Sequence, residues 1–138
     1  MSAPLSTLSS VDEVYGGVRQ ASHILRALKI PRDVRKQVLQ SFDVRTMRVR
    51  AARDAEFGIR YFDNVDAFPR GHSLFETFPA SRESLALEID WNKMTGFKQW
   101  QIRPGATVFE GVVARQGVWR GGQTQKYILD PATDLLEP

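Results

Sequence analysis

The stretch Phe97-Lys-Gln-Trp-Gln-Ile-Arg-Pro-Gly-Ala-Thr-Val-Phe-Glu-Gly111 contains two runs of apolar and aromatic residues on either side of Pro104-Gly105. Runs of this kind, interrupted by proline and glycine, are typical of β-strands joined by a turn. The stretch therefore predicts a hairpin of two strands, at 97–103 and 107–114. Similar runs on both sides of it predict four further strands, at 44–50, 57–63, 73–78 and 124–129.

The N-terminal third has the periodicity of helices rather than of strands. Ser10-Val-Asp-Glu13 forms a capping box, a pattern that begins α-helices. Apolar residues then recur at spacings of three and four, at Val11, Val14, Val18, Ala21, Leu25 and Leu28. This spacing predicts a helix over 10–29, and Pro31 suits the first turn of a second helix that continues to about Phe42.

Length and composition favour one domain. With 138 residues, of which 42% are hydrophobic, the chain can bury one core of ordinary size. We expect an α+β fold in which a helical hairpin over 1–43 precedes a mainly antiparallel, β-rich part over 44–138. Residues 83–95 fit either a strand, because their apolar residues alternate, or a short helical turn.

The composition also excludes several kinds of site. The chain has no cysteine and only His23 and His72 as imidazoles, so we expect neither a disulfide nor a metal site. No apolar run approaches the roughly 20 residues of a membrane span, so we expect no membrane insertion of the folded chain.

Net charge is +3, and the basic residues concentrate in the first half. They predict either a solvated helical face or a surface for RNA, an acidic protein or a phosphorylated cofactor.

Arg60 is the first candidate for chemistry. It lies in Gly58-Ile-Arg-Tyr-Phe-Asp-Asn64, where strand alternation places Ile59 and Tyr61 on one face and Arg60 on the other. A guanidinium in this position can bind a phosphate through its paired donors, or it can form a structural ion pair with a carboxylate. Both interpretations stay open at this point.

Four further residues carry groups suited to a site. Phe75 is either a core residue or a ring that stacks on a planar heterocycle. His72 is either an exposed turn residue or an acid, base or hydrogen-bond donor. Glu110 precedes a glycine near the end of a strand, where it is either solvated, an orienting group for a ribose hydroxyl, or a base. Gln125 points inward on its strand, so its amide needs either a structural partner or a ligand.

Several short motifs occur in a defined order along the chain. They are Arg60-Tyr61, the strand from Gly71 to Phe78, Trp100-Gln-Ile-Arg-Pro-Gly105, Val108 to Gly111, and Gly121-Gly122-x-x-Gln125-x-Tyr-Ile-Leu129. In this order they resemble polymorphic-toxin domains of bacterial effectors with an ADP-ribosyltransferase-like fold, such as the tuberculosis necrotizing toxin family. The resemblance covers residues 57–129. It implies a split antiparallel sheet and an enzyme whose substrate is NAD.

The resemblance also implies roles for individual residues. Arg60 would hold the pyrophosphate and Gln125 the nicotinamide ribose, while Phe75 would pack near the nicotinamide. Further contacts would come from Tyr61, Thr77 and Arg82, the last as a second phosphate ligand. Transferase patterns end in a glutamate where this chain has Gln125, so Glu110, or another acid, is the candidate for the missing acid or base.

The leading hypothesis is therefore an antibacterial toxin that transfers ADP-ribose from NAD to a macromolecule, either a structured RNA or an acidic protein docked on the basic helices. The alternatives are an NAD glycohydrolase, a metal-independent ribonuclease that uses His72 and Arg70, and a binding module without catalysis. For a toxin, the resemblance implies a cognate immunity protein, which the charge of +3 predicts to be acidic. It further implies delivery by the producing bacterium and action in the cytoplasm of the target cell.

Overall fold

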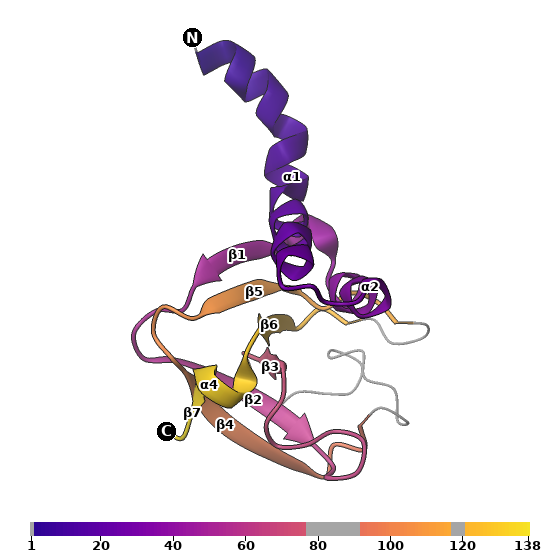
Figure 1. Cartoon of the computed structure of the whole chain (residues 1–138), viewed down its shortest axis with the longest axis vertical. Helices are drawn as coiled ribbons and strands as arrows, with labels where there is room; N and C mark the ends of the chain where they lie inside the picture. The colour runs from indigo at the N-terminus through magenta and orange to yellow at the C-terminus, as the bar shows by residue number, and fades with distance from the viewer. Residues whose placement is uncertain (1, 77–91, 117–120) are drawn as a thin grey trace.

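The computed structural model describes residues 2–76, 92–116 and 121–138, with side chains from residue 14 onward (Figure 1). Its helices are α1 (Ser2–Ala27), α2 (Arg32–Gln40), the 3₁₀ turn η1 (Val44–Thr46) and α4 (Pro131–Asp134). Its strands are β1 (Arg48–Ala51), β2 (Glu56–Phe62), β3 (Ser73–Phe75), β4 (Gly96–Ile102), β5 (Thr107–Val112), β6 (Thr124–Ile128) and β7 (Leu135–Leu136). The fold is thus α+β, as the sequence predicts, with the long helices ahead of the sheet.

The strands form one antiparallel sheet in the order β1-β5-β6-β3-β2-β4-β7. β2 and β4 pair along their whole length, whereas among the described residues β2 and β3 pair only at Ile59 and Phe75. This narrow contact joins two halves of the sheet, β1-β5-β6-β3 and β2-β4-β7. The first half lies above the second in Figure 1.

The predicted hairpin between 97–103 and 107–114 is wrong, although both strands exist. β4 pairs with β2 and β7, and β5 pairs with β1 and β6. The Pro104-Gly105 turn is bound to Ala52 instead: the Gly105 N–H donates to the Ala52 carbonyl (2.9 Å), and the Ala106 carbonyl accepts from the Ala52 N–H (2.8 Å). The turn therefore carries the chain from one half of the sheet to the other.

Several element boundaries differ from the sequence prediction. α1 begins at Ser2, well before Ser10, and Pro4 lies in its first turn, where a proline removes no helical hydrogen bond. Residues 44–46 form η1 rather than the start of a strand, because the Asp43 carboxylate accepts from the Arg45 N–H and turns the chain. β3 covers the first part of the predicted strand 73–78, whose end lies outside the described residues, as does most of the ambiguous segment 83–95.

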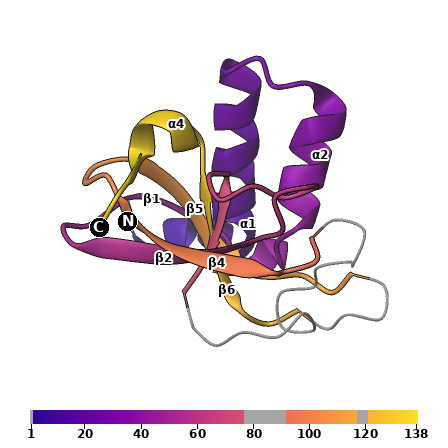
Figure 2. The same cartoon turned by 90° about the horizontal axis from the view of Figure 1, so that it is seen from below.

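Apolar side chains pack on both faces of β5 and β6. Helices α1 and α2 lie side by side on one face (Figure 2), where the buried cluster contains Ala21, Leu25, Val38, Phe42, Met47 and Phe109. On the opposite face a second cluster joins residues of both sheet halves: Ala52, Leu74, Trp100, Ile102, Ala106, Val108, Ile128 and Leu135. This packing holds β5 and β6 in place. Within the described ranges, no helix is long and apolar enough to cross a membrane.

Gly16 and Gly17 provide a matched test of how closely α1 packs. A Cβ on Gly17 would lie 1.8 Å from the Met47 carbonyl oxygen, whereas a Cβ on Gly16 would meet nothing within 4 Å. We expect Gly17→Ala to lower the free energy of unfolding by about 1–3 kcal/mol, because α1 must move away from Met47. Gly16→Ala should raise it by about 0.5–1 kcal/mol, because alanine favours helix. Urea denaturation measures both values, and equal values would contradict the close contact.

Candidate active site

Gln125 lies in a row of residues that crosses four strands. In the register of the sheet, Gly111, Gln125, Phe75 and Ile59 lie opposite one another on β5, β6, β3 and β2. Directly paired residues point to the same face of a sheet. This is the face that the end of α2 approaches, since a Cβ on Gly111 would lie 2.9 Å from the Phe42 ring. The missing side chain at Gly111 therefore lets the end of α2 lie close to Gln125.

The Gln125 carboxamide is buried and only half satisfied. The residue is 4% exposed, and its Nε2 donates to the Ser41 hydroxyl at 3.2 Å. Among the described residues, no donor contacts its Oε1. A buried amide oxygen without a donor costs free energy, so this atom is placed to receive a hydrogen bond from a ligand or a water.

A cavity lies at the C-terminal end of α2. Its volume is about 530 Å³, and the described residues that line it are Gln37, Gln40, Ser41 and Gln116. Ser41 connects the cavity to the sheet, because it both lines the cavity and contacts Gln125. The Gln116 side chain donates to the Gln40 carbonyl at 3.2 Å and so joins the chain after β5 to α2. The volume is within the usual range for small-molecule sites, and these lining side chains are neutral and polar.

Aromatic residues form an apolar wall beside Gln125. Phe75 lies directly opposite Gln125 in the sheet, and the Phe75 and Tyr61 ring centroids are 6.5 Å apart. Both residues are buried, and Val113 and Met94 pack against them. The structure thus brings Gln125, Phe75 and Tyr61, three of the predicted site residues, to one face of the sheet.

Arg60 lies on the other face and is bound to the backbone. Its Nε donates to the Phe68 carbonyl at 2.8 Å and its Nη1 to the Ser73 carbonyl at 3.0 Å. Gly71 lies against the guanidinium, since a Cβ there would be 2.3 Å from Arg60 Cζ. Burial lowers the pKa of Arg60. Arg60 therefore fixes the loop before β3, and the structure does not bring it together with Gln125.

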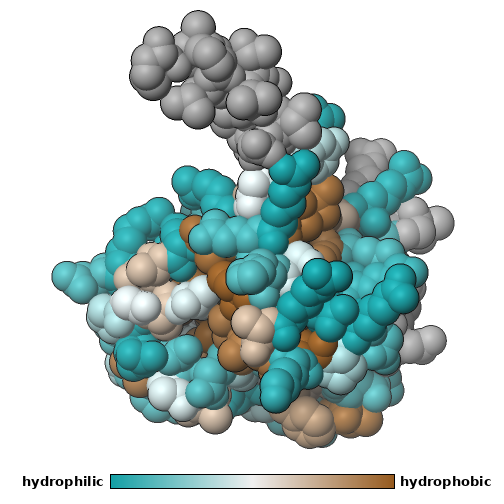
Figure 3. Space-filling model, turned by 45° about the horizontal axis from the view of Figure 1, so that its top comes forward, coloured by the Kyte–Doolittle hydropathy of each residue, from teal (hydrophilic) through white to brown (hydrophobic). Residues whose placement is uncertain are grey.

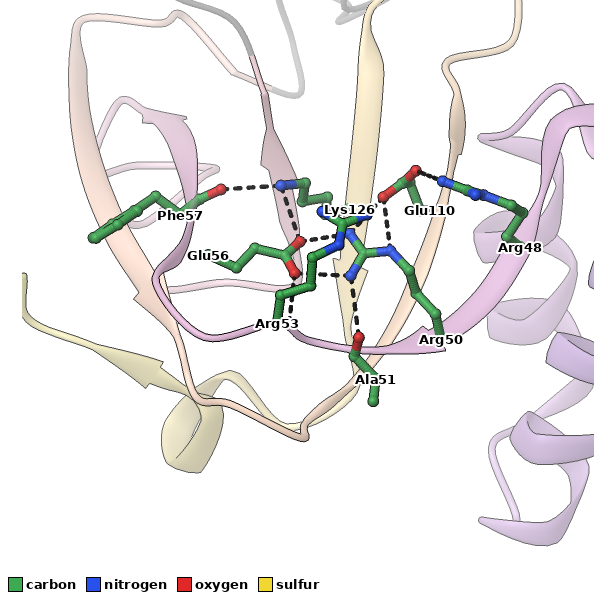
Figure 4. A network of polar contacts seen from close by, with 8 residues as sticks. All are labelled: Arg48, Arg50, Ala51, Arg53, Glu56, Phe57, Glu110 and Lys126. Carbon is green, nitrogen blue, oxygen red and sulfur yellow. Dashed lines mark hydrogen bonds and ion pairs between the residues drawn. The ribbon is translucent and has the colours of Figure 1, made fainter.

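Glu110 also lies on the face opposite Gln125, in the network of charges drawn in Figure 4. It accepts hydrogen bonds from Arg48 and from Arg50, whose Nε lies 2.9 Å away. Burial alone would raise the pKa of Glu110, but the hydrogen bonds from the two arginines outweigh burial and lower it. Glu110 is thus an anion with occupied oxygens, separated from Gln125 by the sheet.

The same network connects the two halves of the sheet. Arg50 on β1 donates to both carboxylate oxygens of Glu56 at the start of β2. Lys126 on β6 lies 3.0 Å from Glu56 and donates to the Phe57 carbonyl at 3.1 Å. Burial raises the pKa of Glu56, but the hydrogen bonds from Arg50, the Arg53 N–H and Lys126 outweigh burial and lower it to about 2. We call Arg48, Arg50, Glu56, Glu110 and Lys126 the charge network.

The low pKa of Glu56 predicts an acid-sensitive fold. Because the folded pKa of about 2 is below the ordinary glutamate value, the stabilisation is complete above about pH 5 and is lost as pH falls toward 2. We expect the urea midpoint to fall over this window. The fall should be smaller in Glu56→Gln, which has no carboxylate to protonate. Part of the fall in the urea midpoint should remain in both proteins, because protonation of Asp63 also destabilises the fold. The backbone N–H groups of Ala67 and Lys93 lower the pKa of that carboxyl. Identical pH profiles for the two would contradict this role.

His72 and Arg70, the residues of the ribonuclease hypothesis, contact different parts of the structure. The exposed His72 ring stacks on Tyr127, with centroids 4.9 Å apart, and its Nδ1 lies 2.6 Å from the Ile128 carbonyl. Arg70 lies over the Trp100 ring and donates to the Leu135 carbonyl.

Thr77 and Arg82, two predicted NAD contacts, lie outside the described residues. In the described part of the chain, no group of His, Asp and Glu side chains is arranged to hold a metal ion.

The residues of α2 and Gln116 were not predicted from the sequence as parts of a site. Gln37 and Gln40 are polar positions of a short amphipathic helix, a pattern that ordinarily indicates exposure to solvent, and Ser41 is the C-cap of that helix. Ser41 and Gln125 are 84 positions apart in the sequence. Their contact depends on how α2 packs on the sheet, which no local pattern encodes.

No family model and no curated protein matches the sequence, but solved structures of other proteins have a similar fold. The structure of Tse6 in complex with Tsi6 matches with a TM-score of 0.68 and 14% sequence identity, over 91% of this chain and 98% of the matched chain. The structure of Tne2 in complex with Tni2 matches with a TM-score of 0.53 and 11% identity, over 65% of this chain and 87% of the matched chain. At these identities the similarity is one of fold.

Proposed function

We propose that the chain is the toxin domain of a bacterial effector and that it cleaves NAD between the nicotinamide and its ribose. The observation that carries the proposal is the buried Gln125 carboxamide, whose oxygen has no donor among the described residues and whose nitrogen contacts Ser41, a residue that lines the cavity at the end of α2. The fold supports it, because Tse6 and Tne2, whose structures are similar, are NAD-cleaving toxins seen with their immunity proteins.

The chemistry of this bond cleavage suits a site with few reacting groups. Positive charge develops on the ribose as the bond to nicotinamide breaks, as in other glycosidic cleavages. The Gln125 Oε1 accepts a hydrogen bond from a ribose hydroxyl, and its negative dipole end stabilises the developing charge. Phe75 and Tyr61 provide an apolar wall for the nicotinamide ring. Cleavage therefore depends on holding the substrate rather than on a covalent intermediate.

Water is the acceptor that the described residues favour. Transfer to a macromolecule gains from a base that removes a proton from the acceptor, and Glu110 was the predicted candidate. Glu110 is held by Arg48 and Arg50 on the opposite face of the sheet. We therefore place NAD glycohydrolysis first, with nicotinamide and ADP-ribose as products and no metal required.

Transfer of ADP-ribose is the second candidate, because the helices present a basic surface. Arg26, Lys29, Arg32 and Lys36 are exposed on and between α1 and α2. Figure 3 shows hydrophilic residues over most of the face that it displays, around a narrower hydrophobic strip. Such a surface suits an acidic protein or an RNA as the acceptor. The basic surface also suits an acidic immunity protein. A toxin that consumes NAD would act in the cytoplasm of the target cell after delivery.

Mass spectrometry of the reaction products tests the proposal. The purified chain, incubated with NAD alone, is expected to release nicotinamide and free ADP-ribose in equal amounts, with or without a chelator. Transfer instead predicts slow turnover of NAD alone and ADP-ribose attached to macromolecules once a bacterial lysate is added. RNA cleavage without NAD turnover would support the ribonuclease alternative, and unchanged NAD under all conditions would contradict the proposal.

A further inference from the structure

We propose that Ser41, at the end of α2, is a positioning residue that fixes the orientation of the Gln125 carboxamide. The inference rests on the proposed function and deepens it. It makes the helical N-terminal part a component of the site rather than a separate docking element.

The hydrogen bonds of Ser41 determine which end of the amide faces it. A serine hydroxyl has a single proton, and the Ser41 Oγ donates that proton to the Val38 carbonyl at 2.6 Å. Toward Gln125 the hydroxyl can therefore only accept. It accepts from the Gln125 Nε2 at 3.2 Å. The reversed amide would place two acceptor oxygens against each other, so Ser41 turns the Gln125 Oε1 away from its own hydroxyl.

Two backbone hydrogen bonds fix the position of Ser41, so its hydroxyl is held in a defined place relative to the Gln125 amide. The Ser41 N–H donates to the Gln37 carbonyl at 3.1 Å, within the last turn of the helix. The Ser41 carbonyl accepts from the Ala114 N–H at 2.9 Å, just beyond β5. Gly111 on β5 has no side chain and so leaves room for the end of α2 to lie against the sheet. Ser41 is thus fixed relative to the same sheet that carries Gln125.

A defined amide orientation matters because the two ends of a carboxamide have opposite polarity. An oxygen aimed at the ribose accepts its hydroxyl proton and stabilises positive charge, whereas an NH₂ group in the same place would oppose that charge. Loss of the Ser41 hydroxyl lets the amide take both orientations. The cleavage rate should fall, while groups elsewhere in the site still bind NAD.

Steady-state kinetics of NAD cleavage test the inference with four variants: Ser41→Ala, Ser41→Thr, Gln125→Ala and the double variant. We expect Ser41→Ala to lower kcat about tenfold, corresponding to one lost hydrogen bond, with KM within about twofold. Ser41→Thr, which keeps the hydroxyl, should restore most of kcat. In the Gln125→Ala background, Ser41→Ala should have no further effect, because there is no amide left to orient. Ser22→Ala, on α1, is the matched control and should match the native kcat.

The outcomes separate this inference from the proposed function. If the native chain cleaves NAD and Ser41→Ala does so equally fast, or if the two losses are additive, the role of Ser41 is wrong and the proposed function stands. If the native chain does not cleave NAD, the proposed function fails, and the side-chain amide signals of Gln125 in ¹⁵N NMR spectra still test the contact. Those signals should shift in Ser41→Ala and not in Ser22→Ala. Should Ser41→Ala not fold, a Ser41→Thr variant that folds but has lost kcat would overturn the inference.

Discussion

Replacement of Gln125 by alanine is expected to lower the rate of NAD cleavage by at least about 100-fold, the size of effect seen when one preorganised polar group is removed from a transition state. The methyl group of alanine fills part of the same buried space but offers no oxygen to the ribose. The protein should stay folded, because the packing on both faces of β6 is retained. The rate of nicotinamide release under saturating NAD, measured with the melting temperature, gives both quantities.

Gln99→Ala is the matched control for this result. Gln99 pairs with Ile59, so it extends the row of Gln125 onto β4 and lies on the same face of the sheet, but its side chain is exposed. Its replacement should leave the rate within about twofold, because surface substitutions away from a site have small effects. A Gln125→Ala variant that cleaves NAD as fast as Gln99→Ala would contradict the assigned site.

Replacement of Glu56 by alanine is expected to lower the free energy of unfolding by roughly 3–5 kcal/mol, the cost of removing one partner from a buried ion pair. Glu56 is 5% exposed and forms ion pairs with Arg50 on β1 and with Lys126 on β6, so it links β2 to the other half of the sheet. Without it, the buried Lys126 loses this carboxylate and keeps its hydrogen bond to the Phe57 carbonyl on β2. Urea denaturation at neutral pH measures the loss.

Glu137→Ala provides the comparison for Glu56→Ala. Glu137 also forms an ion pair, with Lys98 at 2.7 Å, but its side chain is 67% exposed. An exposed pair contributes at most about 1 kcal/mol, because water screens the charges. If the two variants lost equal stability, the charge network would not be what holds the sheet halves together.

Local sequence patterns predicted most of the elements and the faces of the strands. The alternation in 57–63 places Arg60 and Tyr61 on opposite faces, and the structure confirms this placement. Helical spacing predicted α1 and α2, whose apolar residues form the cluster on β5. These predictions succeed because they depend on residues two to four positions apart. β7, which has two residues, is too short for any such period and is held by pairing with β4.

The arrangement of the strands relative to one another could not be read from the same patterns. A Pro-Gly turn between two strands suggests a hairpin, but the backbone of Ala52, far away in sequence, takes the hydrogen bonds of that turn. Arg60 and Gln125 were predicted as partners from their order along the chain, which does not determine the face of the sheet on which each lies. Glu110 resembles a free carboxylate in sequence because Arg48 and Arg50 lie on a different strand. The pairing of distant strands decides the partner of the turn, the faces of Arg60 and Gln125, and the partners of Glu110.

The central claim is that this fold consumes NAD through Gln125. Its most direct test is the NAD content of bacteria that express the native chain or Gln125→Ala at equal levels. We predict that cells with the native chain lose most of their NAD before growth stops, while cells with Gln125→Ala keep both their NAD and their growth. Growth arrest with unchanged NAD, or equal loss of NAD in both strains, would contradict the account.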